Sequence, residues 1–458
     1  MLSRIRPILS LLLVAMGLGA SVTGAAADDA AARPRLTVPY TQFMLPNGLR
    51  VVLHEDHSVP VVAVNVWYHA GSGREKPGRT GFAHLFEHLM FEGSGHVKEG
   101  DFDNLLEGAG GDNNGSTNTD RTNYYLNVPS NALDLALFLE SDRMGYLLDA
   151  MSPAKVDGQR DVVKNERRQG VENQPYGQAF ITLSELLYPA GHPYHWPTIG
   201  YMNDLTAASY EDVTDFFKQY YGPNNATLVV AGDIDPTRTR TLVERWFSDV
   251  KRGPDVPPLS VPPVRLTEVT KKTITDRVQL PRIYLAWPGP SAFKPGDAEL
   301  DVVADLLAGG KSSRLYKRLV YDLQIAQNVF AFQQSGDLGS TFAVVATARP
   351  GHTIEEMTKV IDEELQRLRE APPETREVER VVNGYEAAFY NGLERVGGRA
   401  DTLNSYVTRT GNPDYFAEDL ARYQALAPTD VQAAILTWLP ADRRVELSVV
   451  PDAAPSKE

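Results

Sequence analysis

The sequence predicts an α+β protein of two homologous domains, each a mainly antiparallel sheet packed with helices. Three observations support this prediction: apolar residues alternate in segments such as 61–68, similar blocks occur in the same order in both halves of the chain, and a proline-rich segment separates the halves. Alternation indicates strands in a sheet with one face covered by helices. With 458 residues, the chain is long enough for more than one domain.

The repeated blocks give the order of the elements. The first half starts with a turn at Pro46-Asn47-Gly48, followed by the strands of "LRVVLHED" and "VVAVNVWYHAGSG", then "KPG" and a helix. The second half repeats strand, "KPG", helix and glycines in "TITDRVQLPRIYLAWPGP" and "FKPGDAELDVVADLLAGG". Both halves close with an aromatic residue, proline, a polar turn and an apolar strand, at 220–233 and 438–452. Such self-similarity indicates a duplicated fold.

The proline-rich segment 252–264 marks the boundary between the domains. Its prolines exclude regular structure and favour a stiff, extended linker; they are Pro254, Pro257, Pro258, Pro262 and Pro263. We therefore expect an N-terminal domain at 28–251 and a C-terminal domain at 265–458.

Residues 1–27 have the composition of a secretory signal peptide. Arg4 and Arg6 precede an apolar run at 8–18, and small residues follow up to Ala27. The run is shorter than the roughly 20 residues of a membrane span, although an uncleaved N-terminal anchor is the alternative. The chain has no cysteine and therefore no disulfide. We expect an exported protein of the periplasm, with secretion as the alternative.

The rest of the chain limits the classes of partner. No later segment approaches the length of a membrane span, so we expect none in the mature chain. The formal net charge of −14 argues against nucleic acid as a partner.

The stretch "GRTGFAHLFEHLMFEGSG" at 78–95 is apolar enough to be buried, but it contains His84, Glu87 and His88. Residues four apart on a helix lie on one face, so the two histidines can place their ring nitrogens on one metal ion. Zinc lowers the pKa of bound water to about 7, and Glu87 can then accept its proton as general base. The order is the inverted form of the common zinc-protease motif. The alternative is a pair of core histidines beside an exposed glutamate.

A catalytic zinc needs a third protein ligand and one open position. Glu166 is the best candidate, on a helix that Ser152-Pro153 should start. Spacing alone does not choose Glu166 over Glu172.

The segment "GSGREKPGRTGFAHLFEHLMFEGS" closely resembles the signature of the pitrilysin/insulinase family of zinc metallopeptidases, which includes the mitochondrial processing peptidases. The resemblance continues through 110–129, 173–177, 192–200 and 220–233, and more faintly through the second half. It implies a processing-peptidase-like metallohydrolase fold of the short-chain bacterial branch, with one Zn²⁺ per chain. It also implies that the third ligand is Glu166, within "VVKNERR".

The resemblance also implies where a substrate binds. In "NNGSTNTDRTNYY" it implies an edge strand on which an extended peptide pairs, with Asn114, Gly115 and Ser116 as contact residues. Gly115 would admit a close backbone approach. The alternative is an ordinary hairpin rich in turn residues.

Three further polar residues occur in the segments that resemble the family. Where the family often has a second acid supporting the zinc site, this chain has Gln159, which can still orient a histidine but adds no negative charge, so zinc affinity is expected to be somewhat reduced. His192 and His195 lie among prolines and are expected to be loop histidines, not ligands.

Together these features imply a zinc-dependent endopeptidase that hydrolyses peptides or unfolded segments. In the short-chain branch of the family, a second chain closes a chamber around the site. The alternative from another class is a non-catalytic scaffold or peptide-binding subunit of the same fold.

One part of the family pattern is missing from the second half. Active members carry an Arg and a Tyr in a segment like "SSRLFQEIREKRGLAYS", and these side chains reach the substrate beside the zinc. Here the segment reads "SSRLYKRLVYDLQIAQN", with Val320 and Gln327 at those positions. Arg318 and Tyr321 lie nearby, but on a helix they point in other directions than Val320. We therefore expect the zinc-bearing subunit of a heterodimer whose homologous partner supplies the pair, with a homodimer as the alternative.

Overall fold

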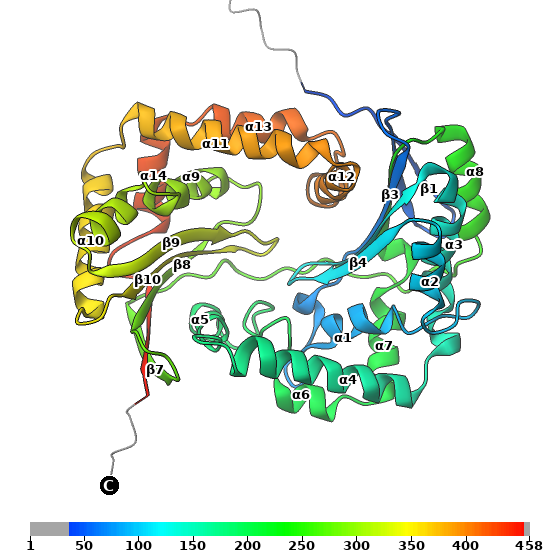
Figure 1. Cartoon of the computed structure of the whole chain (residues 1–458), viewed down its shortest axis with the longest axis horizontal. Helices are drawn as coiled ribbons and strands as arrows, with labels where there is room; N and C mark the ends of the chain where they lie inside the picture. The colour runs from blue at the N-terminus through cyan, green and yellow to red at the C-terminus, as the bar shows by residue number, and fades with distance from the viewer. Residues whose placement is uncertain (1–35, 453–458) are drawn as a thin grey trace, which may run out of the picture. The chain divides into compact units, whose positions relative to one another are not determined.

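Two sheets organise the chain (Figure 1). The computed structural model describes residues 36–452, and from Thr37 on these residues belong to one compact unit. The predicted signal peptide, 1–27, lies outside the described residues. None of the described helices is long and apolar enough to cross a membrane.

The first sheet has six strands in the order β1-β2-β6-β3-β5-β4. Among these strands β2 and β6 run parallel, and all other neighbours are antiparallel. β4 therefore lies at an edge of the sheet. The strands are β1 (Thr41–Met44), β2 (Arg50–Glu55), β3 (Val61–Tyr68), β4 (Asp112–Thr117), β5 (Thr122–Pro129) and β6 (Ala226–Gly232).

The second sheet has five strands in the order β7-β11-β8-β10-β9, with β7 and β11 parallel and the other neighbours antiparallel. If β1 is set aside, this is the order of the first sheet, with the parallel pair in the same place. The predicted α+β fold of two homologous domains is therefore confirmed. The strands are β7 (Thr270–Asp276), β8 (Arg282–Gly289), β9 (Ala326–Gln334), β10 (Ser340–Ala348) and β11 (Val445–Pro451).

Helices pack on both sheets. Those before the linker are α1 (Phe82–Leu89), α2 (Asp101–Gly108), α3 (Leu133–Ala150), α4 (Pro153–Arg167), α5 (Ala179–Leu187), α6 (Met202–Ala207), α7 (Tyr210–Tyr220) and α8 (Pro236–Phe247). Those after it are α9 (Asp297–Ala308), α10 (Ile354–Glu370), α11 (Thr375–Glu394), α12 (Val396–Thr410), α13 (Phe416–Gln424) and α14 (Pro428–Trp438). Side-chain caps start several of them; Thr353 and Glu356, for example, form a capping box on α10.

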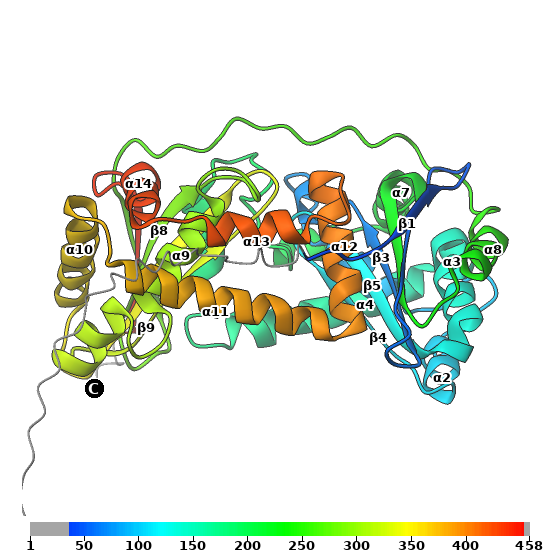
Figure 2. The same ribbon diagram turned by 90° about the horizontal axis from the view of Figure 1, so that it is seen from above.

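The segment 252–264 contains no helix or strand, as its prolines predict. Figure 2 shows it as an extended stretch between α8 and the second sheet. The strands of the first sheet precede this segment in the sequence, and the strands of the second sheet follow it. The proposed boundaries of the two domains themselves stay a prediction.

Strand β3 differs from the expectation of one covered face. Its burial is nearly continuous, because alternate residues face two different layers. Val62, Val64 and Val66 belong to the core shared with α1 and α3. Asn65 and Trp67 point the other way and donate hydrogen bonds to Asp401 on α12, at 3.2 and 3.0 Å. The second layer on the first sheet thus comes from the second half of the chain.

The second sheet receives a helix from the first half in return. Ala179, Leu183 and Leu187 of α5 are buried in a core with Tyr284 and Ala286 of β8. The other face of this sheet packs in a separate core with α9, α10 and α14. Each half therefore covers one face of the sheet of the other half, which the repeat pattern in the sequence did not indicate.

The loops at the ends of two hairpins also join the halves. The Asp120 carboxylate, between β4 and β5, accepts hydrogen bonds from the Tyr194 hydroxyl and, at 3.1 Å, from the Asp337 amide between β9 and β10. The Asp337 carboxylate accepts from Arg409 Nε of α12 at 2.9 Å. Burial, and then repulsion by Asp337, raises the pKa of Asp120 from 3.8 to about 6.

This raised pKa predicts a pH dependence of stability. The folded protein holds the proton of Asp120 more tightly than the unfolded chain, so ionisation of Asp120 lowers the free energy of unfolding as the pH rises from about 4 to about 6. Asp120→Asn cannot ionise. We expect it to match the wild type near pH 4 and to be more stable by about 1–2 kcal/mol at pH 7, measured by urea denaturation.

The matched control is Asp215→Asn, because Asp215 is exposed on α7 and forms an exposed ion pair with Lys218, at 3.7 Å. It should shift stability by less than about 0.5 kcal/mol at either pH. An Asp120→Asn protein that is less stable than the wild type at pH 7 would contradict the prediction.

Candidate active site

Helix α1 carries both histidines of the motif. It begins after Gly81, which has a φ of +87°. A Cβ at this position would lie 2.8 Å from Leu205 Cδ2 and 2.9 Å from the Ile199 carbonyl oxygen, so glycine is required. One face of the helix is buried in the core of the first half; it comprises Phe82, Ala83, Leu85, Phe86 and Leu89. His84 and His88 lie on the opposite, half-buried face.

Helix α4 packs beside α1 and supplies the third residue (Figure 1). The Ser152 hydroxyl accepts a hydrogen bond from the Lys155 amide and Pro153 occupies the first turn, so the helix starts where the sequence predicts. Glu166 lies in its last turn, with its carboxylate toward α1.

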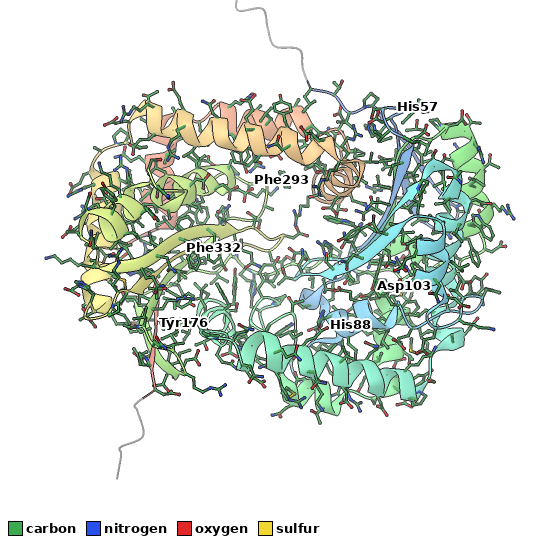
Figure 3. The ribbon with its side chains drawn as sticks, in the orientation of Figure 1. His57, His88, Asp103, Tyr176, Phe293 and Phe332 are labelled. Atoms are coloured by element: carbon green, nitrogen blue, oxygen red, sulfur yellow. The ribbon has the colours of Figure 1, made fainter. Side chains whose placement is uncertain are left out.

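The three predicted ligands lie together. Glu166 Oε2 is 3.7 Å from His84 Nε2 and 3.4 Å from His88 Nε2, and the ligand atoms all lie within 4.8 Å of one another. Figure 3 labels His88 on α1, next to α4. Glu172, the alternative, instead contacts Arg167 Nε at 3.3 Å. The fold thus groups Glu166, and not Glu172, with the histidines.

These three residues fit a zinc ion. A tetrahedral zinc with bonds of about 2.0–2.2 Å holds its ligand atoms roughly 3.3–3.5 Å apart. The separations of Glu166 Oε2 from the two histidine nitrogens, 3.7 and 3.4 Å, are close to this value. Burial, and then the neighbouring His88, lowers the pKa of His84 to about 4, so its ring is neutral at pH 7 and can offer a lone pair. Two imidazole nitrogens and one carboxylate oxygen are a common donor set of catalytic zinc sites.

Glu87 lies beside this group without belonging to it. Burial raises the pKa of Glu87, whereas a hydrogen bond with the Thr117 side chain and the charges of His88 and Arg121 lower it. Its side chain packs against β4, where a Cβ on Gly115 would lie 3.1 Å from Glu87 Cγ. Glycine at this position therefore lets a strand approach the motif helix closely. Thr117 and Arg121 escaped the sequence analysis, because nothing in their local pattern marks them.

Strand β4 presents a free edge next to Glu87. Its inner edge pairs with β5, and no other described strand pairs with its outer edge. An exposed strand edge can bind an extended peptide through main-chain hydrogen bonds. This agrees with the edge strand expected from the resemblance.

The three expected contact residues differ in their surroundings. Asn114 is exposed, and its Oδ1 accepts a hydrogen bond from the Gly115 amide at 2.8 Å. Ser116 is tied to β5 and its turn: its hydroxyl donates to Asn123 Oδ1 at 2.7 Å, and its carbonyl accepts from Arg121 Nη1 at 2.8 Å. Asn114 is therefore the side chain most accessible to a ligand.

Gln159 is not bonded to either histidine among the hydrogen bonds of the described residues. Its amide donates to Glu92 Oε1 at 2.6 Å instead. Burial raises the pKa of Glu92, and the Gln159 bond and the charge of His88 lower it. Gln159 therefore contacts Glu92 and not a histidine of the motif, a partner that its sequence position did not indicate.

The remaining histidines of the sequence analysis lie in a loop, as expected. His192 Nδ1 accepts from the Tyr194 amide at 3.0 Å, and His195 Nδ1 lies 2.7 Å from the Tyr188 carbonyl oxygen. Neither belongs to the group of three ligands.

The two positions of the missing pair differ in burial. Val320 is buried in the core around the second sheet, and Gln327 is exposed on β9. Arg318 pairs with Glu363 and Glu364 at 2.7 and 2.8 Å, and Tyr321 is 74% exposed.

Comparison of the chain with known proteins identifies its family. Residues 50–187 match the family model described as insulinase (peptidase family M16), and residues 207–385 match the peptidase M16 inactive domain. The zinc protease PqqE of Helicobacter pylori is 31% identical over 379 residues, which cover 81% of this chain and 84% of that protein. A probable mitochondrial-processing peptidase subunit beta of Arabidopsis thaliana is 23% identical over 430 residues, covering 91% and 79%.

Solved structures agree. A protease from Helicobacter pylori is similar with a TM-score of 0.85 and 26% identity, covering 90% of this chain and 100% of that one. A peptidase M16 inactive domain from Pseudomonas fluorescens shares the fold, with a TM-score of 0.82 at 17% identity over 91% and 99% of the chains. The relatives are zinc proteases, the matched models span both halves, and the fold is theirs: the chain belongs to the M16 (insulinase) family of peptidases.

Proposed function

We propose that this protein is a zinc-dependent endopeptidase that hydrolyses peptides or unfolded segments. The observation that carries the proposal is the grouping of His84, His88 and Glu166, with Glu87 beside them and next to the free edge of β4. The names of the zinc protease relatives agree with it. The match to an inactive domain concerns residues 207–385, which begin near the end of the first half and lie outside the motif.

The roles of the residues follow from their chemistry. His84, His88 and Glu166 would hold one Zn²⁺, which lowers the pKa of a water molecule and polarises a carbonyl group. Glu87 takes the proton of the attacking water and passes it to the leaving amine. A carboxyl group whose pKa is raised by burial suits this exchange, because it accepts and releases a proton more readily near neutral pH. Strand β4 holds the peptide extended, with Asn114 beside the scissile bond.

Residues 1–27 have the pattern of a signal peptide, and we propose that the protein is exported to the periplasm.

The first prediction from the proposed function concerns the metal. Glu166→Gln replaces a carboxylate ligand by a neutral amide, so we expect zinc affinity to fall by more than about 100-fold, measured by competition with a chelator. Glu172→Gln is the matched control: Glu172 lies six residues further on, contacts Arg167 and should leave affinity unchanged. Zinc binding by Glu166→Gln that equals the wild type would mean that another residue is the ligand.

The second prediction separates binding from chemistry. Glu87→Gln should keep the zinc, since Glu87 is not among the grouped ligands, and should lose hydrolysis by roughly 100-fold or more. The measurement is turnover of an unstructured fluorogenic peptide by protein of equal zinc content. Unchanged turnover, in an assembly that is active with wild-type Glu87, would remove Glu87 from the role of general base.

The third prediction concerns the assembly. Val320 has no donor and Gln327 is a shorter, neutral amide, so neither replaces the Arg and Tyr that stabilise a developing oxyanion, a contribution often worth about 3–4 kcal/mol. We propose that a homologous partner subunit supplies the pair, with a homodimer as the alternative. The chain alone should bind zinc but hydrolyse peptides poorly, and addition of the partner should raise turnover by about 100-fold or more. Full turnover by a purified homodimer would contradict the heterodimer.

A further inference from the structure

The position of His84 depends on the first turn of α1. The helix begins at Phe82, so His84 is only its third residue, and the amides of this turn have no partner within the helix. Gly81, at the N-cap, has no side chain to bind them. If this turn frays, the backbone that carries the first histidine moves with it.

A carboxylate from outside the helix binds these amides. Glu75 Oε2 accepts from the Gly81 amide at 2.9 Å, and Glu75 Oε1 accepts from the Ala83 amide at 2.8 Å. Glu75 is 6% exposed, and no Lys or Arg forms an ion pair with it among the described residues. Burial raises the pKa of Glu75 well above its usual range, whereas the hydrogen bonds from the Ala83 and Gly81 amides lower it. These amides and the positive end of the helix dipole favour the ionised form.

The backbone of Glu75 is itself fixed to the hairpin of β4 and β5. The Glu75 amide donates to the Ser72 carbonyl at 3.1 Å, and the Ser72 amide donates to the Asn118 carbonyl at 3.0 Å. The neighbouring Gly73 amide donates a second hydrogen bond to this loop, to the Thr119 carbonyl at 2.8 Å. A short run of hydrogen bonds thus leads from the loop after β4, through Glu75, to the start of α1.

Neighbouring contacts brace the same turn but do not reach the helix amides. The Thr80 hydroxyl and amide donate to Asp204 Oδ2 at 2.7 and 3.2 Å. Arg167, next to Glu166, donates to the Gly200 carbonyl at 2.6 Å. Glu75 is thus the side chain with both carboxylate oxygens on the first turn of α1.

We propose that Glu75 is a positioning residue for the zinc site: its carboxylate holds the first turn of α1, and with it His84, in register with the loop that follows β4. This inference rests on the proposed function, since it assigns to Glu75 an effect on zinc. It differs from a general stabilising role, which would leave the metal affinity unchanged.

The chain contains a matched control in its second half. Helix α9 also starts at a glycine with left-handed backbone, Gly296, with a φ of +99°. There Glu299 Oε2 accepts from the Gly296 amide at 2.9 Å, but α9 carries none of the grouped metal ligands. Glu299→Gln therefore removes a similar carboxylate cap away from the site.

The experiment compares Glu75→Gln, Glu75→Ala and Glu299→Gln. Zinc affinity is measured by chelator competition, and the melting temperature of each metal-free protein is measured separately. The absorption spectrum of the Co²⁺-substituted protein reports the geometry of the ligands. We expect Glu75→Gln to bind zinc roughly 10–100-fold more weakly, as for other outer contacts of metal ligands, and to alter the Co²⁺ spectrum. Glu299→Gln should lower the melting temperature but leave affinity and spectrum as in the wild type.

The outcomes separate the two proposals. If Glu75→Ala fails to fold, the milder Glu75→Gln decides. Wild-type zinc affinity and Co²⁺ spectrum in Glu75→Gln would overturn the role of Glu75 and leave the proposed function standing. A wild-type protein that binds no zinc would overturn the proposed function, and the role of Glu75 with it.

Discussion

The exchange of helices between the two halves is the constraint on which the rest of the structure depends. Strand β3 is buried on both faces, so the first sheet needs a second layer, and α12 from the second half provides it. The second sheet is covered on one face by α5 of the first half. A sheet with an uncovered apolar face is unstable in water. Each half therefore requires the other, although each repeats the same strand order.

The exchange of helices also determines which face of the first sheet is available to the helices of the candidate site. With α12 on one face of the first sheet, α1 packs on the other face and α4 packs against α1, so that His84, His88 and Glu166 lie together. The close approach of α1 to β4 at Gly115 then brings Glu87 to the edge of the sheet. The proposed metal ligands lie on helices, and the proposed peptide contact lies on a strand edge. Regular secondary structure therefore positions both the metal site and the peptide site.

The sequence predicted what local patterns encode, and missed what depends on distant contacts. The motif on α1 and the start of α4 at Ser152 are local features, whereas the edge strand was expected from the family resemblance. Glu166 needed the family resemblance, because Glu172 lies on the same stretch of chain and only packing separates them. The bond between Asn65 and Asp401 joins residues 336 apart, and the bond between Gln159 and Glu92 joins residues 67 apart. No periodicity marks such pairs.

The two positions where the Arg and Tyr are missing differ in burial, and therefore in how easily the fold could accept the missing side chain. Gln327 is exposed on β9, so a tyrosine there would cost little. Val320 is 9% exposed within the core around the second sheet, next to Leu319 and Ile325, and its carbonyl accepts from Arg349 Nη2 at 3.3 Å. An arginine at this position would bury a cation without a partner or displace part of that core, which costs several kcal/mol. Restoring the pair in this chain would therefore require repacking of the second half. That is a reason to seek the pair in a different subunit rather than in a small movement of this one.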